Sequence, residues 1–327
     1  MNAWSGRTVL VTGAAGFLGG WLCLDLLERG ARVVALLRDE APGGRFVEAR
    51  ERCTVVRGRL QDFETLERAC FQYEPEVIFH LGAQALVGTA LKNPLETLES
   101  NIRGTWNVLE AARRAGNPRV VAASSDKAYG SHREGVYRED SVLDGVYPYD
   151  VSKTCSDLLC RSYARTFGSR VAITRCGNFF GGGDLNWSRL VPGTVRSALA
   201  GERPRLRSNG SFVRDYLYIE DAAAAYLHLA EALEKRPDLA GEAFNFSFES
   251  PMTVLGLVER VLEHCGRPDL VPEILDLPEA RYEIPEQRLS AERARAELGW
   301  SPRVGLEEGL ERTVAWYRSF LDRSPGA

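Results

Sequence analysis

Residues 9–19 read Val-Leu-Val-Thr-Gly-Ala-Ala-Gly-Phe-Leu-Gly, a short apolar run that passes into a glycine-rich turn. The run predicts a strand, and the pattern after the turn predicts an amphipathic helix. Gly13 permits the tight turn, Gly16 lets backbone N–H groups approach a pyrophosphate, and Gly19 lets the helix pack closely on the strand. The helix N-terminus adds a positive field for phosphates. Three glycines alone also suit an ordinary turn, but between a strand and a helix they predict a dinucleotide-binding loop.

The same alternation of apolar runs and amphipathic stretches continues through the first half of the chain. Strands are predicted at Thr8–Thr12, Arg32–Leu37, Cys53–Arg57, Val77–Leu81, Arg119–Ser124 and Arg170–Arg175, and helices at Phe17–Arg29, Phe63–Tyr73, Pro94–Ala115 and Tyr149–Phe167. Continuous apolar strands separated by helices indicate a parallel sheet covered on both faces. This is the doubly wound, Rossmann-type α/β fold, whose ligand crevice lies at the C-terminal ends of the strands.

The second half of the chain is less regular and predicts a smaller C-terminal domain. Helices are predicted at Leu190–Ala200, Asp221–Glu234, Thr253–Cys265 and Ala291–Leu298. We expect residues 1–178 to form the dinucleotide-binding domain, with part of 212–240 returning to it, and 179–327 to form mainly the substrate-binding domain.

The composition of the 327-residue chain narrows the class of protein. Hydrophobic residues make up 44% and charged residues 26%, which are ordinary values for a globular chain. The net charge of −4 gives no reason to expect nucleic acid or an anionic membrane as a partner. The seven cysteines are scattered and the four histidines lie far apart, so we expect neither disulfides nor a metal site. Without a signal peptide or a run long enough to span a membrane, we expect a cytoplasmic location.

Tyr149 and Lys153 stand four residues apart in a predicted helix, and therefore on one face of it. A lysine placed there can lower the pKa of the phenol and can also reach a nicotinamide ribose. A tyrosine that titrates near the working pH is the acid/base needed for alcohol–ketone interconversion with hydride transfer. The spacing also occurs by chance in amphipathic helices. Together with the glycine loop, and with Ser125 just after a predicted strand, it predicts a catalytic Ser-Tyr-Lys set.

The GxxGxxG spacing and the YxxxK pair resemble the short-chain dehydrogenase/reductase superfamily, in particular its extended branch, the NAD-dependent epimerase/dehydratase family of nucleotide-sugar enzymes. Further matches lie at His80–Gln84, Asn101, Arg175–Asn178, Arg214–Tyr216, Ile219–Asp221 and Leu298–Pro302. The resemblance implies cofactor contacts from Gly13, Gly16, Phe17, Leu18, Gly19, Arg38, Asp39, Leu60, Leu81, Ala83, Tyr149 and Lys153. It implies contacts to a nucleotide-sugar substrate from Gln84, Asn178, Arg189 and Arg214. Asn178 also suits a turn cap, Arg214 also suits an ion pair with Asp215, and His80 is expected to be a satisfied strand-end residue without a chemical role.

The end of the second strand leaves the choice of nicotinamide cofactor open. An acidic residue there, such as Asp39, hydrogen-bonds the adenosine ribose and favours NAD, whereas an arginine such as Arg38 receives the 2′-phosphate of NADP. We expect NAD, with NADP as the alternative. The extended branch usually has an aspartate where this chain has Arg59, so either Arg59 makes a different adenine contact or Asp62 takes over.

Residues 124–127, Ser-Ser-Asp-Lys, bear on the reaction. Epimerases of the branch generally place small, inert residues after the catalytic Ser or Thr, whereas dehydratases need a general acid and a general base there. Asp126 and Lys127 supply two titratable groups, although they also suit a surface ion pair. Ser-Asp-Lys resembles the CDP-glucose 4,6-dehydratase family, and so does Gly177–Asp184 followed by Arg189–Pro192. The chain is shorter than typical members and lacks their tryptophan-rich stretch before Tyr149.

The resemblance implies a hydro-lyase that converts CDP-glucose to CDP-4-keto-6-deoxyglucose. Tyr149, helped by Ser125 and Lys153, takes the C4 hydroxyl proton as hydride passes to the nicotinamide. Lys127 as base and Asp126 as acid then eliminate water across C5 and C6, and hydride returns to C6. The alternatives are a nucleotide-sugar C4 epimerase or reductase, and a non-catalytic nucleotide-binding protein on the same fold.

Members of the extended branch usually dimerise through the helices that follow Pro94 and Tyr149. Both stretches carry wide apolar faces here, formed by Trp106, Val108 and Leu109 on one and by Leu158, Leu159 and Tyr163 on the other. We expect a homodimer, although burial of these faces within the monomer explains them nearly as well.

Overall fold

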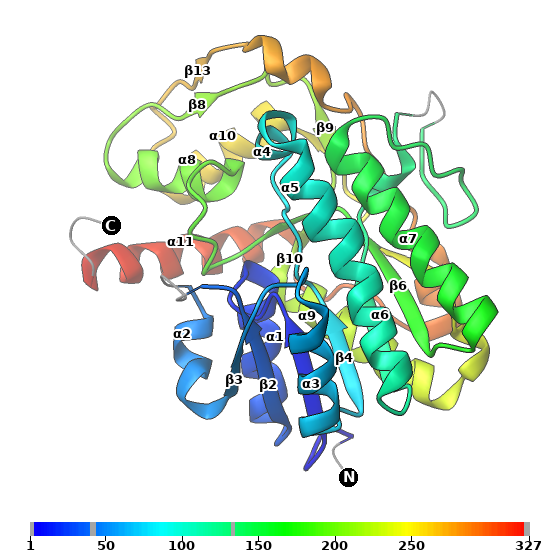
Figure 1. The fold of residues 1–327 in the computed structure, drawn as a ribbon. Coiled ribbons are helices and arrows are strands. Elements are labelled where there is room, and N and C mark those ends of the chain that lie inside the picture. The colour runs from blue at the N-terminus through cyan, green and yellow to red at the C-terminus, as the bar shows by residue number, and fades with distance from the viewer. Residues whose placement is uncertain (1–2, 40–43, 132–134, 324–327) are drawn as a thin grey trace.

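The computed structural model describes residues 3–39, 44–131 and 135–323 and has a seven-stranded sheet at its centre (Figure 1). The strands lie in the order β3-β2-β1-β4-β5-β6-β11, and every neighbouring pair is parallel. Their bounds are β1 Thr8–Thr12, β2 Arg32–Leu37, β3 Thr54–Arg57, β4 Val77–His80, β5 Arg119–Ala123, β6 Val171–Cys176 and β11 Ala243–Phe246. The predicted doubly wound α/β fold is confirmed. The strand order reverses between β1 and β4, which is where such sheets bind their ligands.

Helices cover both faces of the sheet because successive side chains of each strand point to opposite sides. In β1, Val9 and Val11 pack on the side of α1 and α9, whereas Leu10 packs on the side of α3, α6 and α7. The bounds of these helices are α1 Phe17–Glu28, α3 Phe63–Tyr73, α6 Gly104–Arg114, α7 Pro148–Phe167 and α9 Ile219–Lys235. Both faces are dry, which explains the continuously apolar strands.

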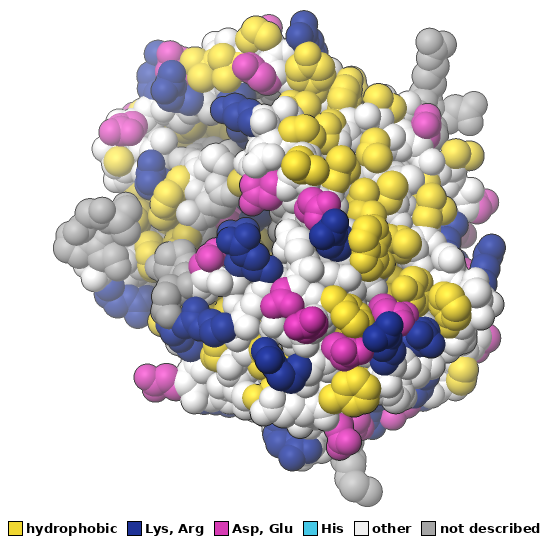
Figure 2. All heavy atoms as spheres, in the orientation of Figure 1, with side chains coloured by type: hydrophobic (Ala, Val, Ile, Leu, Met, Phe, Trp, Pro, Cys, Tyr) yellow, Lys and Arg dark blue, Asp and Glu magenta, His cyan; other side chains and the backbone are white. Residues whose placement is uncertain are grey.

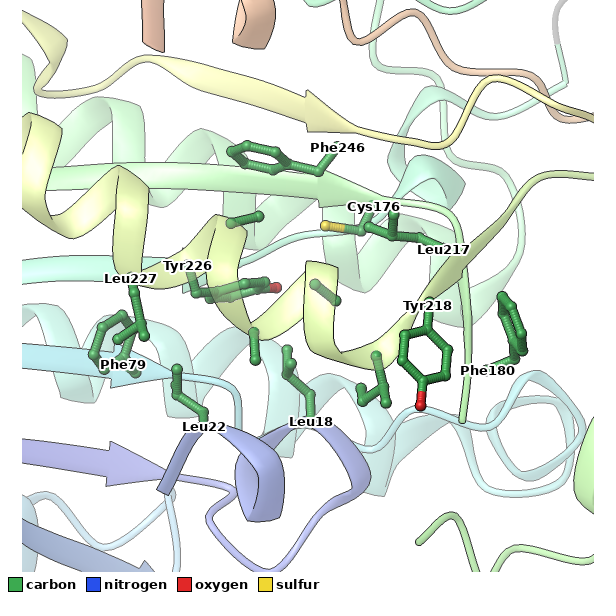
Figure 3. Close-up of a cluster of buried hydrophobic side chains, with 14 of the residues drawn as sticks. Leu18, Leu22, Phe79, Cys176, Phe180, Leu217, Tyr218, Tyr226, Leu227 and Phe246 are labelled. Atoms are coloured by element: carbon green, nitrogen blue, oxygen red, sulfur yellow. The ribbon is translucent and has the colours of Figure 1, made fainter. Parts of the chain in front are cut away.

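Figure 3 shows part of the core on the side of α1 and α9. Leu18 and Leu22 of α1 lie in the same cluster as Tyr226 and Leu227 of α9, and all four are buried. The Tyr226 hydroxyl has a hydrogen-bond partner within this core, because it accepts a 2.7 Å hydrogen bond from Thr174 of β6. Packing of α1 against α9 therefore fixes the helix that begins at the glycine loop.

The C-terminal part contributes three short two-stranded pairings and further helices around the C-terminal ends of the large sheet (Figure 1). The paired strands are β7 Asn178–Phe180 with β10 Tyr216–Tyr218, β9 Val213–Arg214 with β12 Met252–Thr253, and β8 Arg205–Leu206 with β13 Glu273–Ile274. The remaining α-helices are α2 Phe46–Ala49, α4 Val87–Lys92, α5 Pro94–Leu98, α8 Leu190–Leu199, α10 Val254–His264 and α11 Leu306–Arg323. The division of the chain at residue 178 stays a prediction.

Three elements differ from the sequence-based expectations. Strand β11 completes the sheet although it was not predicted, and helix α11 was missed despite buried residues at helical spacing, Leu310, Val314 and Tyr317. The helix expected at Pro94–Ala115 is interrupted by a π-helical segment at Glu99–Arg103. Such segments are frequent at functional sites, and this one carries the buried Asn101. None of the helices in the described ranges is long and apolar enough to cross a membrane.

We expect the substitution Gly19→Ala to lower the free energy of unfolding by about 1–3 kcal/mol, the usual cost of overpacking a core. The added Cβ would overlap the carbonyl oxygen of Gly13 and lie 2.8 Å from Cα of Ala14, and backbone atoms cannot swing aside. NAD binding should weaken in parallel because the loop itself must shift. Chemical denaturation and cofactor titration would measure both effects. The matched control is Gly88→Ala in α4, where nothing lies within 4 Å of the new Cβ, and its stability should not fall.

Candidate active site

A cavity of about 1470 Å³ opens at the C-terminal ends of the central strands. It is lined by nearly all of the predicted site residues: Gly13, Gly16, Phe17, Leu18, Gly19, Arg38, Asp39, Leu60, Leu81, Ala83, Ser125, Asp126, Lys127, Tyr149, Lys153, Asn178, Arg189 and Arg214. The parallel sheet explains this convergence, since the loops that follow its strands all emerge at one edge.

The glycine loop meets the loop after β4 at van der Waals distance. Gly13 has a positive φ of 71°, and a Cβ there would lie 2.7 Å from the backbone nitrogen of Gly82. The two loops are also joined by a 3.1 Å hydrogen bond from the Gly82 N–H to the hydroxyl of Thr12. Gly16 lines the cavity and has no side chain of its own, so a pyrophosphate can approach the backbone of the loop there.

The adenosine end of the cavity carries both residues on which the cofactor choice depends. Arg38 and Asp39 form an ion pair at 2.6 Å, and both side chains are more than half exposed. Arg59 lines the cavity, whereas Asp62 caps helix α3 by accepting hydrogen bonds from the backbone and the hydroxyl of Thr65. Of the two alternatives for the adenine contact, the geometry favours Arg59, because the Asp62 carboxylate is already occupied.

Ser125 stands at the end of β5 and caps a 3-10 turn at Asp126–Tyr129. Its hydroxyl accepts a hydrogen bond from the backbone of Lys127 at 3.2 Å and donates one to the carboxylate of Asp126 at 3.0 Å. The carbonyl of Ala128 also accepts a 3.0 Å hydrogen bond from Thr154 of α7. The turn thus presents Asp126 and Lys127 to the cavity while it is fastened to the helix that carries Tyr149.

The electrostatics of the Tyr149–Lys153 pair are set mainly by burial. Burial raises the pKa of Tyr149 to about 12, and the main opposing influence is a hydrogen bond with Ser125. Lys153 is not among the main influences on the phenol pKa. Its ammonium group donates a 2.8 Å hydrogen bond to the carbonyl of Ala123, and its own pKa falls to about 8 through burial. The lowering of the phenol pKa by Lys153 stays a prediction.

Asp126 and Lys127 are shifted in the directions that a general acid and a general base need. Burial raises the pKa of Asp126, whose exposed fraction is 6%, which excludes a surface ion pair. Burial and the nearby Arg214 lower the pKa of Lys127 to about 8. Asp150 belongs to the same cluster, and burial raises its pKa to about 6. A carboxyl group with a raised pKa and a lysine with a lowered pKa therefore lie side by side.

Two arginines border the substrate side of the cavity, and their partners explain the motifs around them. Arg214 is buried and donates to the carboxylate of Glu283 at 3.3 Å, instead of pairing with Asp215. Arg189 forms a 2.9 Å ion pair with Asp184, so the end of the glycine-rich motif and the arginine after it are one structural unit. Both guanidinium groups remain on the cavity wall with Asn178, where a diphosphate can reach them.

Gln84 is the exception among the predicted substrate residues, since it does not line the cavity. Its side-chain amide folds back on its own loop, with hydrogen bonds of 2.9 and 3.1 Å to the backbone of Leu86. Its backbone is held by Asn101, which also donates a 2.8 Å hydrogen bond to Ser152 of α7. In the structure the amide shapes this loop, and its contact with the substrate stays a prediction.

His80 has hydrogen-bond partners at both ring nitrogens, Thr12 at 2.9 Å and Thr105 at 3.1 Å, as expected of a residue without a chemical role. Burial lowers its pKa to about 3, so it stays neutral. Among the residues with described positions, no group of three His, Cys, Asp or Glu side chains is arranged to hold a metal ion.

The family model described as the NAD dependent epimerase/dehydratase family matches residues 9–246. The chain belongs to this family. A CDP-glucose 4,6-dehydratase of Salmonella typhimurium is 32% identical to it over 98% of the chain and 93% of that protein. A dTDP-4-dehydro-6-deoxy-D-allose reductase of a Streptomyces species is 33% identical over 97% of the chain and 98% of that protein.

Solved structures of family members superpose closely on the chain. A dTDP-glucose 4,6-dehydratase of Streptomyces venezuelae with NAD bound has a TM-score of 0.87 at 29% identity, covering 98% of this chain and 99% of that one. A UDP-glucose 4-epimerase of Thermotoga maritima with UDP-glucose has a TM-score of 0.87 at 27% identity, covering 96% and 100%. Membership in the family confirms the predicted resemblance to NAD-dependent sugar-nucleotide enzymes and NAD as the cofactor. Because such relatives include dehydratases, a reductase and an epimerase, the reaction has to be argued from the site residues.

Other residues of the site escaped the sequence-based reasoning. Gln287 accepts a hydrogen bond from the ammonium group of Lys127, and Glu283 pairs with Arg214. Both lie in an irregular segment of the chain that carries no recognisable family motif. Asp150 offered a signal, since it directly follows Tyr149 in a helix whose first turn faces the strand ends.

Proposed function

We propose that the protein is a nucleotide-sugar 4,6-dehydratase that converts CDP-glucose to CDP-4-keto-6-deoxyglucose. The observation that carries this proposal is the Asp126–Lys127 pair, which lines the cavity beside Ser125 and Tyr149 with opposite pKa shifts. A C4 epimerase needs to oxidise and re-reduce one carbon only, and it has no use for a second acid and base. A dehydratase needs both to remove the C5 proton and to release the C6 hydroxyl as water.

Each step can be assigned to a group of this chain. Tyr149 takes the proton of the C4 hydroxyl, while Ser125, its hydrogen-bond partner, orients that hydroxyl. NAD, when bound, supplies the hydride acceptor and a positively charged ring that favours the phenolate. The C4 ketone acidifies the C5 proton, which Lys127 removes as its free amine. Asp126 donates its proton to the departing C6 hydroxyl, which leaves as water. As the returned hydride completes the methyl group at C6, Lys127 gives its proton back to C5, and the proton taken from the C4 hydroxyl restores the Asp126 acid.

The choice of a CDP-sugar rests on two stretches and one relative. Ser125-Asp126-Lys127 and the Gly177–Asp184 loop match the CDP-glucose 4,6-dehydratase pattern, and the Salmonella typhimurium enzyme of that name is similar over nearly the whole chain. The diphosphate would lie between Arg189, Arg214 and Asn178 on the wall formed mainly by residues 179–327. NAD would then be bound mainly by residues 1–178.

Incubation with CDP-glucose and NAD tests the reaction directly. A 4-keto-6-deoxy product has a base-sensitive absorbance, and its mass is that of the substrate less one water. CDP-glucose should react faster than the UDP-, GDP- or dTDP-sugar. Release of CDP-galactose in place of a keto sugar would establish the epimerase alternative, and NAD binding without turnover of any of the four sugars would establish a non-catalytic protein.

The dehydration rate should depend on pH through both members of the Asp126–Lys127 pair. Lys127 acts as the free amine and Asp126 as the protonated acid, so kcat/KM should follow a bell-shaped profile with one limb near pH 8, the pKa of Lys127. Initial rates of keto-sugar formation between pH 6 and 9.5, at roughly constant ionic strength, would measure this limb. A profile without a limb near pH 8 would exclude Lys127 as the base.

We also propose that two copies of the chain pack through α5, α6 and α7. Figure 2 shows apolar side chains gathered over these helices. Leu95 of α5, Trp106 of α6 and Leu158 of α7 are 69%, 39% and 51% exposed. Val108 and Leu109, by contrast, are buried within the monomer. Light scattering should give about twice the chain mass, and Leu158→Asp should give the monomer. Val271→Asp, which changes an exposed apolar residue outside these helices, should leave the mass unchanged.

A further inference from the structure

The side chain of Gln287 is the direct partner of the proposed catalytic base. The ammonium group of Lys127 donates a hydrogen bond to Oε1 of Gln287, and Gln287 is only 1% exposed. The other end of the same amide, Nε2, is buried and has no hydrogen-bond partner among the described residues. A buried donor without a hydrogen-bond partner destabilises a fold. The unpaired amide nitrogen beside a titrating lysine therefore suggests a functional role.

Hydrogen bonds hold the backbone on both sides of Gln287, so the fold fixes the position of its side chain. The Gln287 N–H donates to the carbonyl of Val213 at 3.0 Å, and Val213 in turn donates to Pro285 at 2.9 Å. On the other side, the Tyr137 N–H donates to the carbonyl of Arg288 at 2.8 Å. These bonds tie the segment to β9 and to the residues that follow the 3-10 turn of Lys127.

A base lysine alternates between an ammonium group, which only donates hydrogen bonds, and an amine, which can also accept one. A carboxamide can serve both forms, because its oxygen accepts and its nitrogen donates. The two ends are nearly equal in size, so a half rotation of the amide exchanges them without disturbing the neighbours. We propose that Gln287 is a positioning residue for Lys127, with Oε1 holding the ammonium and Nε2 holding the free amine. This inference rests on the proposed function, in which Lys127 is the base.

A neutral partner also leaves the balance between the two forms to the surrounding charges. Lys127 faces Asp126 on its own turn, Asp150 of α7, Arg214 of β9 and Glu283 of the segment that carries Gln287. The three carboxyl groups favour the ammonium, whereas Arg214 and burial oppose it, and the pKa falls to about 8. A carboxylate in place of the amide would add a fourth negative neighbour and hold the proton on the base.

The chain offers a clean way to observe this lysine, because its only lysines are Lys92, Lys127, Lys153 and Lys235. NMR of protein labelled with ¹³C and ¹⁵N in lysine would give one side-chain signal for each, and Lys127→Arg would assign the signal of interest. Titration of that signal in Gln287→Glu should show a pKa about one unit or more above that of the unmodified protein. The limb of kcat/KM near pH 8 should move to higher pH by the same amount.

Two further variants separate positioning from a structural role. Gln287→Met removes both polar ends of the amide without adding charge, so kcat should fall at every pH while the KM for the sugar nucleotide and the limb near pH 8 stay in place. Gln72→Glu adds the same charge on an exposed face of α3 and should change neither the lysine signal nor the rate. Circular dichroism and thermal melting would confirm that each variant is folded.

The outcomes distinguish this inference from the function on which it rests. A Lys127 pKa that does not move in folded Gln287→Glu, or a Gln287→Met variant with undiminished kcat, overturns the role of Gln287. A Lys127 pKa that moves while the dehydration limb stays in place overturns the role of Lys127 as base, and with it the proposed mechanism. Matching shifts in both measurements support the positioning role.

Discussion

Replacing Tyr149 with Phe is expected to lower kcat for keto-sugar formation by about 10²–10⁴-fold, the usual contribution of a positioned general acid–base group. The phenol oxygen is the atom that takes the C4 proton, so its loss stops the reaction at the first step. The ring should stay in place, because Tyr149 is buried and Phe fills the same space without a new contact. Steady-state rates at saturating CDP-glucose would measure the loss, and the NAD content should remain that of the unmodified enzyme.

Tyr73→Phe provides a matched control for this variant. It removes a phenol oxygen whose neighbour is the exposed Gln72 on α3, far from the cavity lining, and it should leave kcat unchanged. A loss of less than about tenfold in Tyr149→Phe would fall below the range for general acid–base catalysis and would assign the C4 proton to another group.

The central sheet was predictable because its signals are local. Each of the first six strands contains an apolar run, which is largely buried in all of them except β3, and the glycine loop marks where the first of them ends. Strand β11 lacks such a signal, since it has four residues and one of them is the polar Asn245. The Asn245 side chain is satisfied by Tyr129 and Tyr137, which are more than a hundred residues away along the chain. Partners at that separation leave no periodic trace in the sequence.

The candidate site likewise contains residues that local sequence signals predict and residues that only tertiary contacts reveal. Ser125, Tyr149 and Lys153 were found because they follow strand ends or repeat at helical spacing, and parallel strands bring such positions to one edge. Spacing places a lysine beside a tyrosine but does not tell where its ammonium group points. In the structure it points to the carbonyl of Ala123, and burial of Tyr149 raises the phenol pKa. Gln287 is set by backbone hydrogen bonds between distant segments, so only the three-dimensional structure reveals it.

Replacing Lys127 with Met is expected to block water elimination by about 10²–10⁴-fold while it spares oxidation at C4. Met has about the length of the lysine stem but no group that can remove the C5 proton. Tyr149, Ser125 and Lys153 remain, so hydride transfer can still proceed and reduced nicotinamide should accumulate when CDP-glucose is added. Absorbance of the reduced cofactor, and deuterium uptake at C5 from heavy water, would separate the two steps. The unmodified enzyme should show the reverse, with rapid exchange and little reduced cofactor.

The stability of Lys127→Met must be measured together with its activity, because the substitution leaves the Gln287 amide without its hydrogen-bond partner. Such a loss costs about 1–3 kcal/mol, and a folded variant should still show a cooperative thermal transition. Lys235→Met, at the exposed end of α9, removes a lysine outside the cavity lining and should not alter the rate. Dehydration at the unmodified rate in folded Lys127→Met would remove the base from the mechanism. The Asp126–Lys127 pair would then no longer separate a dehydratase from the epimerase that shares its fold.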